Sequence, residues 1–325
     1  MRQLIATAFL SVALVGQAGL AAAGQEAALD ALVRAYPDPL AGYDSADLIW
    51  RDGTRMPLSD GRPAKAFAEM LRHGSILDQI RLPYPAGATR AGPGPDDDPG
   101  RIRNRAFFDK MYGDCWKGEV APRLVPVVWL PRSWGRTIRI TSVNGVAERL
   151  AAVSEELDDL PDAVKRYAYP PAGTYNCRTV ADTGGPSMHS WGAAIDINAA
   201  RADYWLWHGS GVIEAGLVNR IPPEIVAIFE RHGFIWGGKW SHYDTMHFEY
   251  RPELLDGEQP RASVSFQPAT RAPGSPACRC AECHIRRARR PASSSPTAAR
   301  RHSRLRRSPW HRERWSWPAP DGKRG

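Results

Sequence analysis

Two short segments, each carrying polar residues in apolar surroundings, constrain this 325-residue chain most strongly. The first, Ser187 to Asp196, reads S-M-H-S-W-G-A-A-I-D and sets His189 seven residues before Asp196. The second, Asp244 to Tyr250, reads D-T-M-H-F-E-Y. An imidazole or a carboxylate in a strand of core composition is costly to bury unless it is paired or bound to a metal. We therefore expect the fold to bring the two segments together.

The polar residues of the two segments form a ligand set suited to zinc. Two imidazoles, of His189 and His247, and the carboxylate of Asp196 leave a fourth position on the metal for water. Gly192 permits a tight turn between the first two ligands. Asp244 lies three residues before His247, where its carboxylate can act as general base on that water or be an ordinary turn residue. We predict one Zn²⁺ ion held by the two histidines and Asp196.

The pattern S-x-H-x-x-G-x-A-x-D, followed by a carboxylate three residues before a histidine, resembles the D-alanyl-D-alanine carboxypeptidase-like zinc peptidases. These share their zinc-site fold with lysostaphin-type peptidases and the hedgehog amino-terminal domain. The resemblance covers residues 125–255 and implies the same three zinc ligands, with Asp244 as the catalytic base. Several members have Glu at the base position. This chain has the shorter Asp244 there, and in this it resembles the endopeptidase-like branch of the family.

The resemblance also suggests roles for residues around the ligands. Arg178 stands where the family places a cleft arginine, which would hold the substrate carboxylate or the developing oxyanion; the alternative is a surface arginine. Ser187 would bind substrate or only shape the turn. Glu249 shares the face of His247 and either orients that ligand or belongs to a structural ion pair.

These features predict a zinc metallopeptidase that hydrolyses an amide bond in peptidoglycan stem peptides. Carboxypeptidase action on a D-Ala-D-Ala terminus and endopeptidase action of the L-Ala-D-Glu type both remain open. The alternative from another class is a non-catalytic cell-wall binding or signalling module that keeps the zinc fold. The intact base position argues against this alternative.

The apolar pattern predicts an α+β fold, with a small, mostly antiparallel sheet that carries the zinc site and is flanked by helices. Strands are expected over 47–51, 124–130, 137–143, 174–180, 194–198 and 246–250. Helices are expected over 27–36, 64–72 and 146–157 and from 222 to 232, and the Pro- and Gly-rich residues 84–101 are expected to form a loop. The period of two in the last strand sets His247 and Glu249 on one face.

Residues 1–23 have the features of a secretory signal peptide, namely Arg2, an apolar run and the small residues Ala21 to Ala23. The alternative is an uncleaved membrane anchor. No later stretch is apolar enough to span a bilayer. We expect an exported protein, in the periplasm or outside the cell, without a membrane span after signal cleavage.

The net charge of +8 comes from the C-terminal part of the chain. Residues 259–325 hold 16 Lys and Arg against 3 Asp and Glu, whereas the preceding residues hold 27 against 32. A nucleic-acid partner is therefore not expected for the globular part. We predict a zinc peptidase domain over 121–256, with residues 24–120 packed on it or capping it. A disordered basic tail over 257–325 is expected, which either contacts anionic surfaces or reflects out-of-frame reading of GC-rich DNA.

The five cysteines divide into two groups. Cys115 and Cys177 are the two in the globular part, and an oxidising compartment would allow a disulfide between them; the alternative is two separate buried thiols. Residues 280–284 read C-A-E-C-H, the attachment pattern of c-type haem. The surrounding Arg-rich stretch has no apolar residues to bury a porphyrin, so a thiol cluster that also includes Cys278 is favoured.

Overall fold

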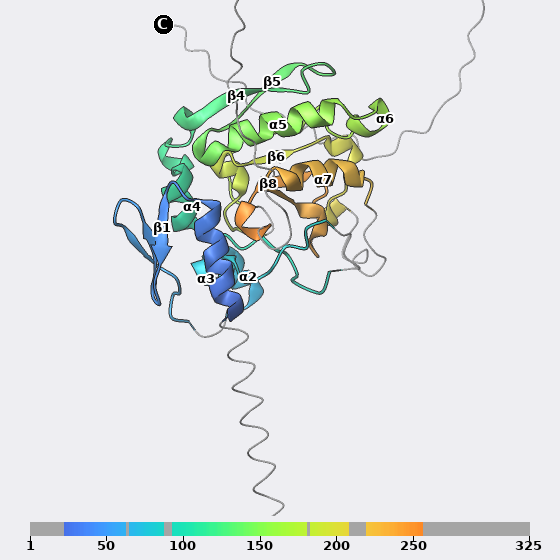
Figure 1. Cartoon of the computed structure of the whole chain (residues 1–325). Helices are drawn as coiled ribbons and strands as arrows, with labels where there is room; N and C mark the ends of the chain where they lie inside the picture. The colour runs from blue at the N-terminus through green and yellow to red at the C-terminus, as the bar shows by residue number, and fades with distance from the viewer. Residues whose placement is uncertain (1–22, 63–64, 88–92, 181–182, 208–218, 256–325) are drawn as a thin grey trace, which may run out of the picture. The chain divides into compact units, whose positions relative to one another are not determined.

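The computed structural model describes residues 23–62, 65–87, 93–180, 183–207 and 219–255 (Figure 1). The predicted signal peptide, except residue 23, lies outside these ranges, as do the basic tail and the C-x-x-C-H stretch. The described part has the predicted α+β architecture, with three small antiparallel sheets and helices packed around them. Among the described residues, no helix has the length and apolar character needed to cross a bilayer.

The N-terminal part begins with a helix over residues 23–35 and continues through β1 (Leu40–Tyr43), β2 (Asp47–Trp50), β3 (Arg55–Pro57), α2 (Phe67–His73), α3 (Ile76–Gln79) and α4 (Arg105–Tyr112). The C-terminal part contains β4 (Leu124–Trp129), β5 (Arg136–Thr141), α5 (Val146–Asp158), α6 (Asp162–Lys165), β6 (Ala194–Asp196), α7 (Pro223–Arg231), β7 (Phe234–Trp236) and β8 (His247–Tyr250). The predicted helices over 27–36, 64–72, 146–157 and 222–232 correspond to the first helix, α2, α5 and α7.

The sheet that carries both polar segments has the strand order β6-β8-β7, so β8 is its central strand. Both pairings are antiparallel. The register sets Asp196 opposite His247 and Ala194 opposite Glu249. Directly opposed residues of an antiparallel pair have Cα atoms about 4.5 to 5.5 Å apart. The backbone pairing alone therefore brings two predicted ligands together.

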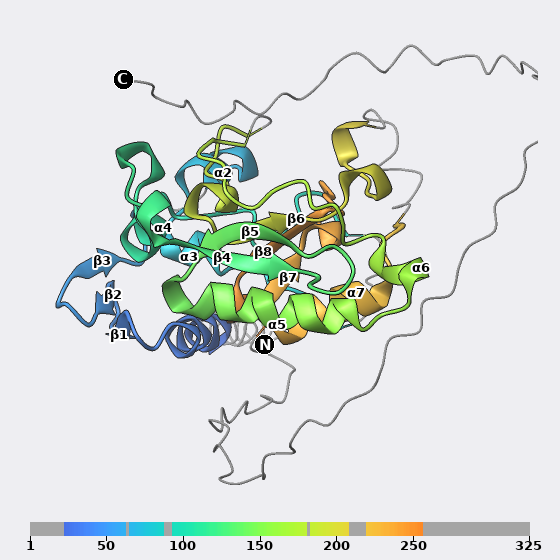
Figure 2. The ribbon, with the colours of Figure 1, turned by 90° about the horizontal axis from the view of Figure 1, so that it is seen from above.

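Helix α7 covers one face of this sheet, opposite to the face that carries His247. The ring of Phe229 in α7 stacks on Phe248 of β8 with the ring centroids 3.8 Å apart. Side chains alternate along a strand, so His247 and Glu249 point away from this apolar layer. Helix α5 packs on the β4–β5 hairpin and on α7, as Figures 1 and 2 show.

The apolar core continues from the N-terminal part into the C-terminal part. Leu32 of the first helix and Phe107 and Phe108 of α4 belong to the same buried cluster as residues of α5 and of the site-bearing sheet. Phe108 lies against Trp191, with ring centroids 4.8 Å apart. Residues on both sides of position 120 therefore share one core.

The predicted strand over 174–180 is wrong. Within this segment only Thr179 makes a bridge, an isolated one to Pro186. The backbone N–H of Asn176 donates to the carbonyl of His189 instead of to a partner strand. Its β-branched composition suggested a strand, but several of its hydrogen bonds go to the turn that holds His189 and Ser190.

Cys115 and Cys177 form a disulfide, with Cα atoms 5.7 Å apart and a sequence separation of 62 residues. The bond joins the 3-10 turn Cys115–Lys117 to the irregular segment 174–180. It therefore ties the N-terminal part to the segment that leads into the first ligand.

Replacing both cysteines, as Cys115→Ser with Cys177→Ser, should lower the free energy of unfolding by about 2 to 4 kcal/mol, because the unfolded chain loses a constraint on a long loop. Urea denaturation of the variant and of the oxidised wild type measures the difference. Equal unfolding midpoints for the two proteins would contradict the expectation.

Candidate metal centre

Three predicted ligands converge on one point. His189 comes from the 3-10 turn Met188–Trp191, Asp196 ends β6 and His247 begins β8. His189 Nε2 lies 3.1 Å from Asp196 Oδ1, His247 Nδ1 lies 3.0 Å from the same oxygen, and the two nitrogens are 3.1 Å apart. Tetrahedral zinc with bonds of about 2.0 Å separates its ligand atoms by about 3.3 Å. The triangle therefore has the size of one face of a zinc coordination tetrahedron.

Hydrogen bonds hold the outward nitrogen of each ring and leave the inward nitrogen for a metal. His189 Nδ1 lies 2.7 Å from the carbonyl oxygen of Thr174, which can only accept, so this nitrogen carries the hydrogen. His247 Nε2 likewise donates to Glu249 Oε2 at 2.9 Å. The inward nitrogens are then the ring atoms that can offer lone pairs to a cation bound beside the Asp196 carboxylate. The donor set thus fits Zn²⁺.

Local features of the chain fix the turn that carries His189. Ser187 Oγ accepts a hydrogen bond of 3.3 Å from the N–H of His189. Gly192 ends the turn with a φ of 63°, a conformation that side chains other than glycine rarely adopt. A Cβ atom at this position would also lie 2.6 Å from Leu124 Cδ2. The glycine allows both the turn and its close packing on β4.

Charged and hydrogen-bonded neighbours outweigh the effect of burial on the pKa values of three groups at the site. Burial alone would raise the pKa of Asp196, but the adjacent His189 and His247 hold it well below its usual range. Burial alone would lower the pKa of His247, but hydrogen bonds to Asp196 and Glu249 raise it to about 9. Burial also opposes ionisation of Glu249, yet Arg103 and His247 lower its pKa to about 2. The site therefore stabilises positive charge at its centre, as a cation site requires.

Asp244, the predicted base, is partly buried, and its Oδ1 atom has no hydrogen-bond partner among the described residues. Burial and the negative charge of Asp196 raise the pKa of Asp244 to about 6. Its carbonyl accepts a hydrogen bond of 3.2 Å from the N–H of His247. The structure thus sets an unpartnered carboxylate oxygen in the electrostatic field of the three predicted ligands.

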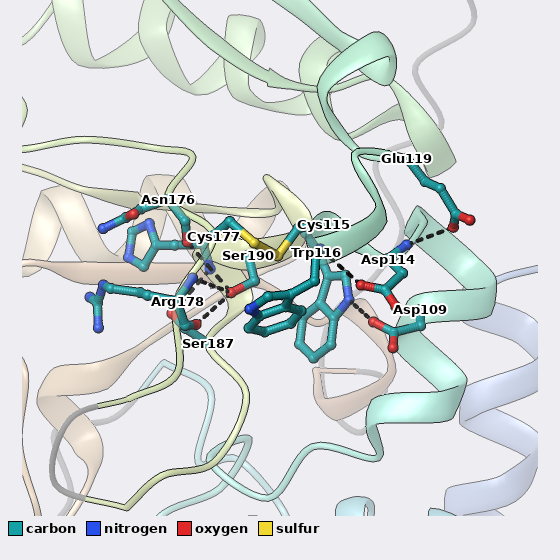
Figure 3. The surroundings of a disulfide bond; sticks show 12 residues. Asp109, Asp114, Cys115, Trp116, Glu119, Asn176, Cys177, Arg178, Ser187 and Ser190 are labelled. Atoms are coloured by element: carbon teal, nitrogen blue, oxygen red, sulfur yellow. Dashed lines mark hydrogen bonds between the residues drawn. A yellow bond between two sulfur atoms is a disulfide. The ribbon is translucent and has the colours of Figure 1, made fainter. Parts of the chain in front are cut away.

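Arg178, the predicted cleft arginine, follows the half-cystine Cys177. Its backbone is fixed by Ser190 Oγ, which accepts from the Arg178 N–H at 3.1 Å and donates to the Arg178 carbonyl at 2.6 Å. The side chain is exposed and extends away from the disulfide in Figure 3. Among the described residues, its guanidinium makes one long hydrogen bond, of 3.5 Å to the Thr179 carbonyl. It keeps most of its donors for another group.

Two further residues contact the predicted ligands or their partners and are not evident from the sequence. Arg103 forms an ion pair with Glu249, the carboxylate behind His247. Thr174 acts through its backbone carbonyl, which no side-chain pattern could reveal. Arg103 lies 144 positions before His247, directly after a loop without periodicity, so no local signal connected it to the site.

Residues 181–250 match the family model described as D-alanyl-D-alanine carboxypeptidase. The matched stretch contains Asp244 and the three residues that could hold a metal, and it begins after Arg178. This match confirms the resemblance found in the motif. Neither the curated proteins nor the solved structures contained a match to the chain.

Changing Asp196 to Asn should weaken zinc binding on the order of 100-fold or more, because even changes behind the ligands cost 10- to 100-fold. Competition with a chromophoric chelator measures the dissociation constant. His232→Gln serves as a control, since His232 pairs with Glu156 at 2.6 Å and has no hydrogen bond to the three predicted ligands among the described residues. Wild-type zinc affinity in the Asp196→Asn protein would rule out this ligand set.

Proposed function

We propose that this chain is a zinc metallopeptidase that hydrolyses an amide bond in peptidoglycan stem peptides. The observation that carries the proposal is the triangle of His189, Asp196 and His247, whose inward atoms lie 3.0 to 3.1 Å apart with both ring tautomers fixed from behind. The family match supports peptidase chemistry, and its description points to a D-alanyl substrate.

Zinc bound at these ligands would polarise the scissile carbonyl and make a water nucleophilic near neutral pH. The remaining steps belong to the protein. Asp244 accepts a proton from the attacking water through its unpartnered oxygen and returns it to the departing amine. The backbone hydrogen bond from His247 to Asp244 keeps this base beside the ligand.

Arg178 binds negative charge on the substrate. Its guanidinium is exposed, and the Ser190 hydroxyl fixes its backbone next to the turn that carries His189. An arginine pairs with a carboxylate through two parallel hydrogen bonds, and it also stabilises an oxyanion. The first use suits a carboxypeptidase, which must hold a terminal carboxylate. The second suits either a carboxypeptidase or an endopeptidase.

The disulfide supports a location outside the cytoplasm, where such bonds persist. Peptidoglycan lies in the same oxidising environment. The predicted signal peptide and the proposed substrate therefore agree with the chemistry of the Cys115–Cys177 bond.

Incubating the zinc-loaded protein with purified muropeptides, followed by mass spectrometry, tests the proposal. Loss of one terminal alanine would identify a carboxypeptidase, and a cut within the stem would identify an endopeptidase. Unchanged muropeptides, with zinc shown to be bound, would contradict the enzyme and favour the non-catalytic wall-binding module.

Replacing the base, as Asp244→Asn, should lower the turnover rate by about 10²- to 10⁴-fold, the usual contribution of a general base, while zinc stays bound. Initial rates on the cleaved muropeptide and the zinc content of the same sample give the two readouts. Asp162→Asn is the control, because Asp162 is a surface carboxylate whose side chain is 90% exposed. Asp244 is not the base if Asp244→Asn turns over as fast as Asp162→Asn.

A further inference from the structure

Residues 97–103, which precede α4, lie along the chain segment that contains β8. Residues 97–103 belong to the N-terminal part, outside the 181–250 stretch that matches the family. Backbone and side-chain N–H groups of residues 240–251 donate hydrogen bonds to residues 97–100. They join Ser241 N to Asp97 O at 3.1 Å, His242 N to Asp98 Oδ1 at 3.0 Å, Trp240 Nε1 to Pro99 O at 2.7 Å and Arg251 Nη1 to Gly100 O at 2.8 Å.

Gly100 allows this close approach. Its φ of 93° lies in the region that favours glycine. A Cβ atom there would collide with Ile235 Cδ1 and lie 3.3 Å from Glu249 Oε1. The segment therefore passes directly against the carboxylate that supports His247.

Arg103 ends this segment and bonds both ligand-bearing segments with one guanidinium. Its Nη2 pairs with Glu249 Oε2, the same oxygen that accepts from His247 Nε2 at 2.9 Å. Its Nη1 donates to the carbonyl of Pro186 at 3.1 Å, three residues before His189. The side chain is 5% exposed and Glu249 is fully buried, so solvent does not weaken the pair.

A contribution to folding stability does not by itself account for a buried arginine at position 103. Buried ion pairs are often no more stabilising than apolar residues of similar size. In addition, the Nε atom of Arg103 is buried without a hydrogen-bond partner among the described residues. What the guanidinium does provide is a fixed position for Glu249, which in turn fixes the tautomer and orientation of the His247 ring.

We infer that Arg103 is a positioning residue of the metal centre, acting on His247 through Glu249, so that the N-terminal part completes the site. The inference rests on the zinc site of the proposed function. It gives residues 24–120 a specific task in addition to their share of the core.

The test measures zinc affinity and thermal stability of Arg103→Met, Glu249→Gln and the double variant, with a chromophoric chelator as competitor. Each single variant should weaken zinc binding by roughly 10- to 100-fold. The double variant should bind zinc about as well as Glu249→Gln alone, because both changes act on the same contact. Arg103→Lys keeps the charge but not the two-pronged geometry, so its affinity should lie between those of wild type and Arg103→Met.

Lys239→Met is the matched control. Lys239 is 5% exposed and pairs with Glu230 at 2.6 Å, and none of its hydrogen bonds within the described residues reaches a metal ligand or Glu249. This variant should lose thermal stability and keep wild-type zinc affinity.

Unchanged zinc affinity in Arg103→Met, with a loss of stability like that of Lys239→Met, would overturn the inference. If Arg103→Met does not fold, unchanged affinity in Arg103→Lys and Glu249→Gln would do so. Zinc binding by the wild type without muropeptide cleavage would contradict the proposed function and leave the inference intact, because the affinities need no turnover. A wild-type chain that binds no zinc would overturn both.

Discussion

The antiparallel pairing of Asp196 with His247 is the interaction on which the candidate site depends. The backbone hydrogen bonds of this strand pair bring a carboxylate and an imidazole together independently of any metal. A shift of one residue in this register would turn His247 toward the apolar layer where Phe229 stacks on Phe248, and would expose Phe248 in its place. The aromatic packing of α7 on β8 therefore protects the geometry of the site. The β6–β8 pair, the turn after Ser187 and the packing of α7 act together as one support for three ligand atoms.

The support extends into the N-terminal part through buried charge. Glu249 accepts a hydrogen bond from His247 and forms ion pairs with Arg103 and Arg251. Arg251 also pairs with Glu253. Glu253 in turn accepts a hydrogen bond of 2.7 Å from Tyr36 in the N-terminal part. A buried carboxylate without such partners would be costly, so the N-terminal part and the metal centre depend on each other energetically. The disulfide adds a covalent link between the same two parts, next to Arg178.

The sequence predicted the parts of the site that local pattern encodes. Asp196 and His247 could be found because polar residues stood in strands of core composition, and His189 because of its fixed spacing from Asp196. Helix α5 was predicted because Val146, Leu150, Val153 and Leu157 recur with helical period, and all four are fully buried. Segment 174–180 was mistaken for a strand because its partners, the His189 carbonyl and the Ser190 hydroxyl, are tertiary contacts. Arg103 escaped prediction for the same reason, since its contact with Glu249 spans 146 positions and leaves no mark in either local sequence.

Diffraction from crystals of the zinc-loaded protein, recorded on both sides of the zinc absorption edge, shows directly which atoms bind the ion. One anomalous peak is expected within about 2.0 to 2.2 Å of His189 Nε2, Asp196 Oδ1 and His247 Nδ1, with Glu249 still bonded to His247 Nε2. A zinc peak bound through other atoms, or zinc-loaded crystals without a peak between these three residues, would contradict this ligand set.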